Sequence, residues 1–202
     1  MYHRPGLGGS TYIDVPRSTE HVTNEMMQIV TKLLNITEPI ILIGHSYGGL
    51  CAQHFSKLYP ARIRGLLLLD STSVDLHRLD QLHLPYLDEN DSDAAWIEKC
   101  KEYAALPPKE LSKQLNPFLT EEQKKLPHYI QEKLIAFYTN PSLYKTMLQE
   151  ITSWEKDTFI IKSLSFKGKF PVTTIGRDKK KCLSNHIADG VPKEEAKLLE
   201  DT

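Results

Sequence analysis

The stretch Pro39-Ile40-Ile41-Leu42-Ile43-Gly44-His45-Ser46-Tyr47-Gly48-Gly49 decides how this chain folds. Its first half is short, wholly apolar and rich in β-branched residues. Such a run predicts a strand from 39 to 43 that is covered on both faces of a parallel sheet. A helical segment follows from about Leu50 to Leu58. The pattern Gly-x-Ser-x-Gly at 44–48 therefore lies in a tight turn between a buried strand and a helix.

The segments on either side of this turn extend it into a larger unit. Apolar side chains recur at helical spacing between about residues 19 and 35, which predicts a helix with one apolar face. A second continuous apolar run, 63–69, ends at Asp70. Strand, turn, helix and strand within about 30 residues are typical of a βαβ unit.

The middle of the chain has a different character. From Ser71 to about Gly168 the sequence is polar, helix-prone and interrupted by prolines. Thr120–Gln123 matches a capping box, and Asn140-Pro141 supplies an N-cap followed by proline at the first helical position. About 100 residues of helices without strands are typical of an inserted lid, which we expect over 71–168.

Strand character returns after this insertion. Residues 170–175 read as a strand that closes at Gly176-Arg177-Asp178, and 193–200 read as the start of a helix. The lysine run 179–181 is expected to form a solvated loop. We therefore expect a core formed by residues 1–70 and 169–202.

Ser46 is the candidate nucleophile. A nucleophilic hydroxyl of this pattern must project from a sharp, strained turn into open space. Gly44 and Gly48 are expected to remove side chains that would otherwise clash in that turn. The next helix directs its N-terminus at the site, so the N–H of Tyr47 can stabilise a developing oxyanion.

These residues give the chain a resemblance to the α/β-hydrolase fold superfamily. Residues 3–10, His-Arg-Pro-Gly-Leu-Gly-Gly-Ser, resemble the loop after strand four, with His3 where the family often has Asp. Residues 39–60 are similar to strand five and the nucleophile elbow, 62–70 to strand six, and 170–178 to strand seven. The resemblance implies a mainly parallel α/β sheet, incomplete because the chain is truncated at both ends, with the helical lid inserted.

The same resemblance implies a Ser–acid–His triad in that chain order. The acid is either Asp70, at the end of strand six, or Asp178, after strand seven, and both stay open. His186 is the only histidine after Asp178, but 183–186 read as a loop, so the base stays unassigned and is expected in sequence that the chain lacks. His45 is expected to point away from the triad.

Two function classes follow from this resemblance. Haloalkane dehalogenases and epoxide hydrolases of the family carry Asp at the elbow, so Ser46 implies ester, thioester or amide chemistry. The first class is an esterase- or lipase-like hydrolase that acts on carboxylic esters through an acyl-enzyme. The missing histidine and second oxyanion donor motivate the alternative, a catalytically inactive truncated remnant or a module that binds a small molecule or a partner.

Composition limits the other possibilities. The formal net charge of −1 gives no attraction to nucleic acid. Cys51, Cys100 and Cys182 lack metal-site or disulfide spacing and favour a reducing compartment, and we expect neither metal nor cofactor. No stretch approaches the ~18 apolar residues of a membrane helix. A cytoplasmic protein with a small acyl substrate is expected, and its oligomeric state stays open.

Overall fold

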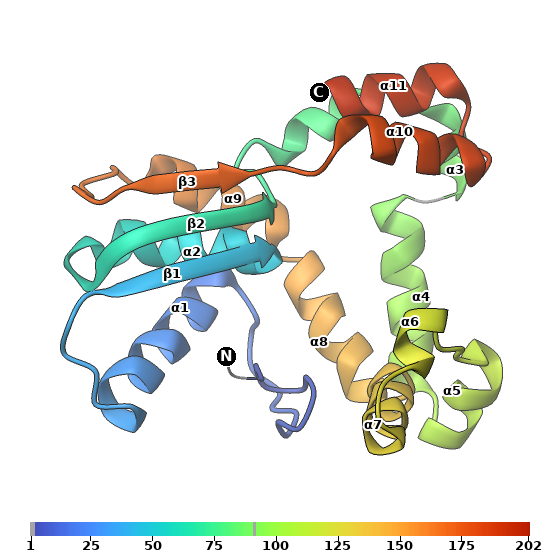
Figure 1. Cartoon of the computed structure of the whole chain (residues 1–202), viewed down its shortest axis with the longest axis horizontal. Coiled ribbons are helices and arrows are strands. Elements are labelled where there is room, and N and C mark those ends of the chain that lie inside the picture. Colours follow the sequence, from blue (N-terminus) through green and yellow to red (C-terminus); the bar gives the residue numbers. More distant parts are fainter. Residues whose placement is uncertain (1–2, 91) are drawn as a thin grey trace. The chain divides into compact units, whose positions relative to one another are not determined.

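The computed structural model describes residues 3–90 and 92–202, which fall into two compact units (Figure 1). The first, called the sheet unit, comprises Arg17–Ser92 and Ser153–Thr202. The second, called the helical unit, comprises the segment up to Pro16 and Asp93–Thr152. The described residues between the last two strands form helices and no strand, and these helices are shared between the two units.

The sheet unit is built on three parallel strands in the order β1–β2–β3. They span Ile40–Ser46, Ile63–Ser71 and Val172–Ile175. Helix α2, Tyr47–Leu58, connects β1 to β2. This architecture confirms the α/β fold class and all three predicted strands.

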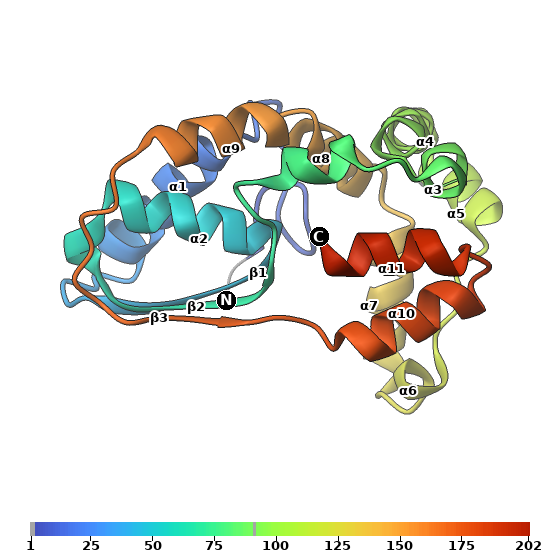
Figure 2. The same cartoon turned by 90° about the horizontal axis from the view of Figure 1, so that it is seen from above.

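Helices cover one face of this sheet. In the sheet unit, α1 (Thr19–Gln28, continued by a π-helix at Ile29–Leu33), α2 and α9 (Trp154–Ser163) lie on the same side (Figure 2). Their apolar core contains Val22, Tyr47, Leu50, Cys51 and Ile161. On the other face, Ile41 and Ile43 are 67% and 58% exposed. The prediction that this strand is covered on both faces is therefore wrong for the described residues, because the helices of this unit pack on one face only.

Buried hydrogen bonds connect these three helices to one another. The Thr19 N–H donates to the Asp157 carboxylate at 2.7 Å, and Thr19 Oγ1 lies 2.8 Å from His54 Nδ1. Burial lowers the pKa of His54 and raises the pKa of Asp157. The network fixes α2, whose first residue follows Ser46.

Helices α10 (Lys179–Ala188) and α11 (Lys193–Asp201) form a hairpin after β3. The predicted loop at 183–186 is wrong, since those residues lie within α10. The physical reason is a cap that sequence reasoning did not assign: the Asp178 carboxylate accepts from the N–H groups of Lys180 and Lys181. The lysine run therefore forms the first turn of a helix and not a loop. Three shorter helices complete the described part of this unit, 3-10 helices at Pro60–Arg62 and Leu76–Gln81 and α3 at Pro85–Asn90.

The helical unit contains α4 to α8, which span Asp93–Ala105, Pro108–Leu115, Glu121–Lys124, His128–Tyr138 and Pro141–Ile151. Both predicted caps are confirmed, the capping box at Thr120 and the Asn140 side chain that accepts from Ser142 N–H. The segment after residue 3 packs within this unit. Its Arg4 guanidinium makes two 2.9 Å bonds to the Glu150 carboxylate.

Candidate active site

Ser46 occupies a strained junction between β1 and α2. Its φ of 49° and ψ of −128° place it in a region that residues with a side chain rarely adopt. Serine at an N-cap normally accepts a hydrogen bond from the helix it precedes. Ser46 makes no such bond, and its side chain is exposed. The backbone strain thus turns the hydroxyl away from the helix and towards solvent.

The glycines of the turn have different roles. A Cβ on Gly44 would lie 2.6 Å from both the Gly48 carbonyl oxygen and the Gly49 Cα, so only glycine fits there, as expected. A Cβ on Gly48 would meet nothing within 4 Å, and the prediction that this glycine avoids a clash is wrong. The crowded position is Gly49, where a Cβ would lie 2.1 Å from Ser71 Oγ and 2.5 Å from Ser71 Cβ.

These two neighbouring glycines should respond oppositely to the same substitution. We expect Gly49→Ala to destabilise the fold by about 1–3 kcal/mol, because the strand end at Ser71 must move. Gly48→Ala adds a methyl group in open space within a helix and should stabilise it by up to about 1 kcal/mol. Urea denaturation followed by circular dichroism gives both values. Equal effects from the two substitutions would contradict the close approach of Gly49 to Ser71.

Asp70 lies in a bulge at the carboxyl end of β2. In the register of the two strands, His45 pairs with Leu69 and Ser46 pairs with Ser71, so Asp70 is the additional residue. Its φ is 38°, a left-handed conformation, and its side chain is exposed. The Thr72 N–H also donates to the Ser46 carbonyl oxygen at 3.1 Å. Asp70, one of the two candidate acids, therefore lies two residues before Thr72, whose N–H bonds directly to the Ser46 backbone.

The other candidates are placed differently. Asp178 caps α10, as described above. His186, on α10, lies 3.1 Å from a carboxylate oxygen of Glu200. His45 is exposed, and since side chains alternate along a strand it lies on the same face as Ile43. Among the described residues, no hydrogen bond joins a histidine to the Ser46 hydroxyl.

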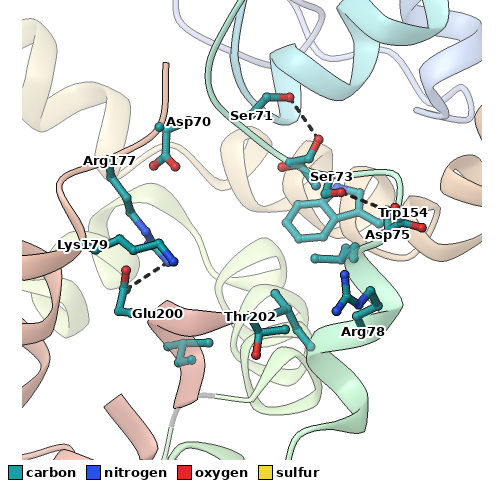
Figure 3. A pocket seen from close by; sticks show the side chains of 15 residues that line it. Asp70, Ser71, Ser73, Asp75, Arg78, Trp154, Arg177, Lys179, Glu200 and Thr202 are labelled. Atoms are coloured by element: carbon teal, nitrogen blue, oxygen red, sulfur yellow. Dashed lines mark hydrogen bonds and ion pairs between the residues drawn. The ribbon is translucent and has the colours of Figure 1, made fainter. Parts of the chain in front are cut away.

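A cavity of about 560 Å³ opens at the carboxyl ends of β2 and β3, within the sheet unit (Figure 3). Asp70–Ser73 form one wall, and Arg177, Lys179 and Glu200 belong to the β3–α10 and α11 side. Trp154 lines the cavity and also stacks on Tyr47, with ring centroids 6.1 Å apart. Ser46 itself is not part of the lining.

Three charged residues that line this cavity, Asp75, Arg177 and Glu200, take part in ion pairs. Arg177 and His186 both contact Glu200 at 3.1 Å, and the Glu200 side chain is only 4% exposed. Asp75 pairs with Lys162, and this hydrogen bond lowers the pKa of Asp75. Within residues 3–90 and 92–202 there is no group of three or more metal-ligating side chains, and no helix there is long and apolar enough to cross a membrane.

Sequence reasoning missed several residues that build this site. Gly49, Gln53 and Ser71 pack between the elbow helix and the end of β2. The doubled glycine at 48–49 is a signal for close approach, but only the paired strand identifies Ser71 as the neighbour. The sequence predicted a role only for the N–H of Tyr47, as an oxyanion donor. Its buried ring also supports the turn, and its hydroxyl donates to the Arg17 carbonyl at 3.0 Å.

Solved structures of other proteins share this fold at low sequence identity. A proposed epoxide hydrolase from Pseudomonas aeruginosa is 14% identical, with a TM-score of 0.61 over 85% of this chain and 60% of that one. The epoxide hydrolase CorEH is 17% identical, with a TM-score of 0.54 over 85% and 62%. An alpha/beta hydrolase fold protein from Burkholderia ambifaria is 14% identical, with a TM-score of 0.53 over 92% and 68%. The chain thus spans about three fifths of the length of the first two.

Such similarity supports the fold and does not identify a reaction. No curated protein sequence matches the chain significantly. The family model of the alpha/beta hydrolase fold matches residues 1–168, which is most of the chain and includes the elbow and the bulge at Asp70. This chain is therefore a member of the alpha/beta hydrolase fold family.

Proposed function

We propose that this chain carries the nucleophile of a serine hydrolase that cleaves carboxylic esters through an acyl-enzyme at Ser46. One observation carries the proposal: the hydroxyl of Ser46 is exposed at a strained strand-to-helix junction and does not cap the helix that it precedes. A serine that served only to start α2 would adopt a relaxed N-cap backbone and bond to the first turn. Strain retained at such a position is typical of a functional residue.

The chemistry assigned to the site follows from its parts. Ser46 Oγ attacks the acyl carbonyl carbon while its proton passes to the imidazole of the triad, and a tetrahedral intermediate with a negatively charged oxygen forms. Collapse of the intermediate breaks the ester C–O bond, the alcohol leaves with that proton, and the acyl group stays on Ser46. The N–H of Tyr47, at the positive end of α2, stabilises that oxygen. The cavity beside Asp70 and Trp154 is large enough for a small substrate and mixes apolar with polar lining.

We assign the triad acid to Asp70. Asp178 already satisfies two backbone N–H groups of α10, and a carboxylate in that role is held at the helix end. Asp70 makes no comparable cap, stands in a strained bulge, and lines the cavity next to the Ser46 strand. In this assignment, the Asp70 carboxylate orients the imidazole of the base. We do not assign the base to a histidine.

A second candidate function is a non-catalytic binding module of the same fold. It is favoured by the positions of the histidines, since His54 is buried in the Thr19 network and His186 pairs with Glu200. On this reading the cavity binds a small molecule and Ser46 performs no chemistry.

A fluorophosphonate probe distinguishes these two functions, because it reacts covalently with an activated serine hydroxyl and not with an ordinary one. In a protein that carries this chain together with its triad base, we expect a single adduct that peptide mass spectrometry assigns to Ser46. Unfolding the protein in urea before labelling is the control and should abolish the adduct. A folded protein with that base present and no adduct at Ser46 contradicts the hydrolase and leaves the binding module.

A further inference from the structure

The side chain of Gln53 joins the elbow helix to the strand end that carries Asp70. Gln53 lies on α2, and its amide nitrogen is 3.0 Å from Ser71 Oγ, 3.1 Å from the Thr72 carbonyl oxygen and 3.4 Å from the Gly49 carbonyl oxygen. Ser71 Oγ in turn donates to the Thr72 carbonyl at 3.0 Å. A single amide therefore contacts both residues that follow Asp70.

At residues 70–72, the regular β-ladder between β1 and β2 is interrupted. The bulge at Asp70 interrupts the ladder between β1 and β2, so the strand end is held by individual bonds. One of them runs from Thr72 N–H to the carbonyl oxygen of Ser46. The absent side chain of Gly49 lets Ser71 approach α2 closely enough for Gln53 to reach it.

We infer that Gln53 is a positioning residue, which holds the bulge of Asp70 in fixed register with Ser46. The structural part of this inference stands by itself. Its effect on catalysis rests on the proposed function. Gln53 is not among the residues that line the cavity beside Asp70, so it acts through Asp70 and the 71–72 backbone. Displacement of a catalytic group by about 1 Å can lower a rate by about 100-fold, so a small relaxation of the bulge should be measurable.

The structural part is tested by hydrogen–deuterium exchange on Gln53→Leu, which keeps the size of the side chain and removes its donors. We expect the amides of 70–72 to exchange at least about tenfold faster, while those of 63–69 keep wild-type rates. Gln131 provides a matched control, since its amide donates to the Lys124 and Leu126 carbonyl oxygens in the helical unit. Gln131→Leu should leave the exchange of 70–72 unchanged. Unchanged exchange of 70–72 in Gln53→Leu overturns the inference.

The catalytic part is tested by a double-mutant cycle on the fluorophosphonate labelling rate of Ser46. We expect Gln53→Leu to lower this rate by about 10- to 100-fold in the wild-type background and by less than about twofold in an Asp70→Asn background. Equal losses in both backgrounds would mean that Gln53 acts only through general stability, and the positioning role would be rejected. If wild-type protein does not label, the proposed function fails, and the exchange measurement alone decides whether Gln53 holds the bulge.

Discussion

Ser46→Ala should reduce fluorophosphonate labelling to background and lower any turnover of 4-nitrophenyl acetate by at least about 1,000-fold. The reason is local: the substitution removes one oxygen atom and leaves the Cβ and the strained backbone in place. Because Ser46 Oγ makes no capping bond to α2, its removal should cost the fold almost nothing. Urea denaturation should therefore give a free energy of unfolding within about 0.5 kcal/mol of wild type.

Ser46→Gly separates the strain from the chemistry. Glycine adopts a φ of 49° and a ψ of −128° without a Cβ penalty, so this variant should be inactive and more stable than Ser46→Ala by about 1 kcal/mol. The greater freedom of glycine in the unfolded chain opposes part of that gain. If Ser46→Gly is less stable than Ser46→Ala, the turn stores no strain, and the main support for a nucleophile at this position is lost.

Much of the sheet and its elbow could be predicted because the signal is local. A continuous apolar run, a Gly-x-Ser-x-Gly turn and a helical segment specify β1, the junction and α2 through periodicity and turn chemistry alone. The second strand followed from another continuous apolar run, 63–69, and the third from the strand character of 170–175. The caps at Thr120 and Asn140 were equally local, since each depends on residues at most three positions apart.

The rest depends on contacts that a single sequence does not encode visibly. The exposure of Ile41 and Ile43 reflects which helices pack on the sheet, and the apolar run reads the same whether one face or both are covered. Asp178 could be read as a loop residue or an acid until its bonds to the N–H groups of α10 were visible. Gln53 and Ser71 are 18 positions apart and become neighbours only through the βαβ crossover.

Asp70→Asn should lower the labelling rate of Ser46 by about 100- to 10,000-fold, the range expected when a triad histidine loses the carboxylate that orients it. Asparagine is nearly the same size as aspartate and tolerates left-handed backbone, so the bulge with its φ of 38° should persist. The loss would then report the missing negative charge and not a collapsed strand end. Hydrogen–deuterium exchange of residues 70–72 checks this directly and should match wild type.

Asp178→Asn is the matched control for this assignment, because asparagine caps a helix about as well as aspartate. It should keep α10 intact and change the labelling rate by less than about threefold. The reverse pattern, a large loss in Asp178→Asn and none in Asp70→Asn, would place the acid after β3. It would require Asp178 to give up its bonds to Lys180 and Lys181 N–H when the site is assembled. A labelling loss in only one of the two variants therefore assigns the acid to the end of β2 or to the end of β3. We expect the loss in Asp70→Asn, because Asp70 has a strained backbone and lines the cavity.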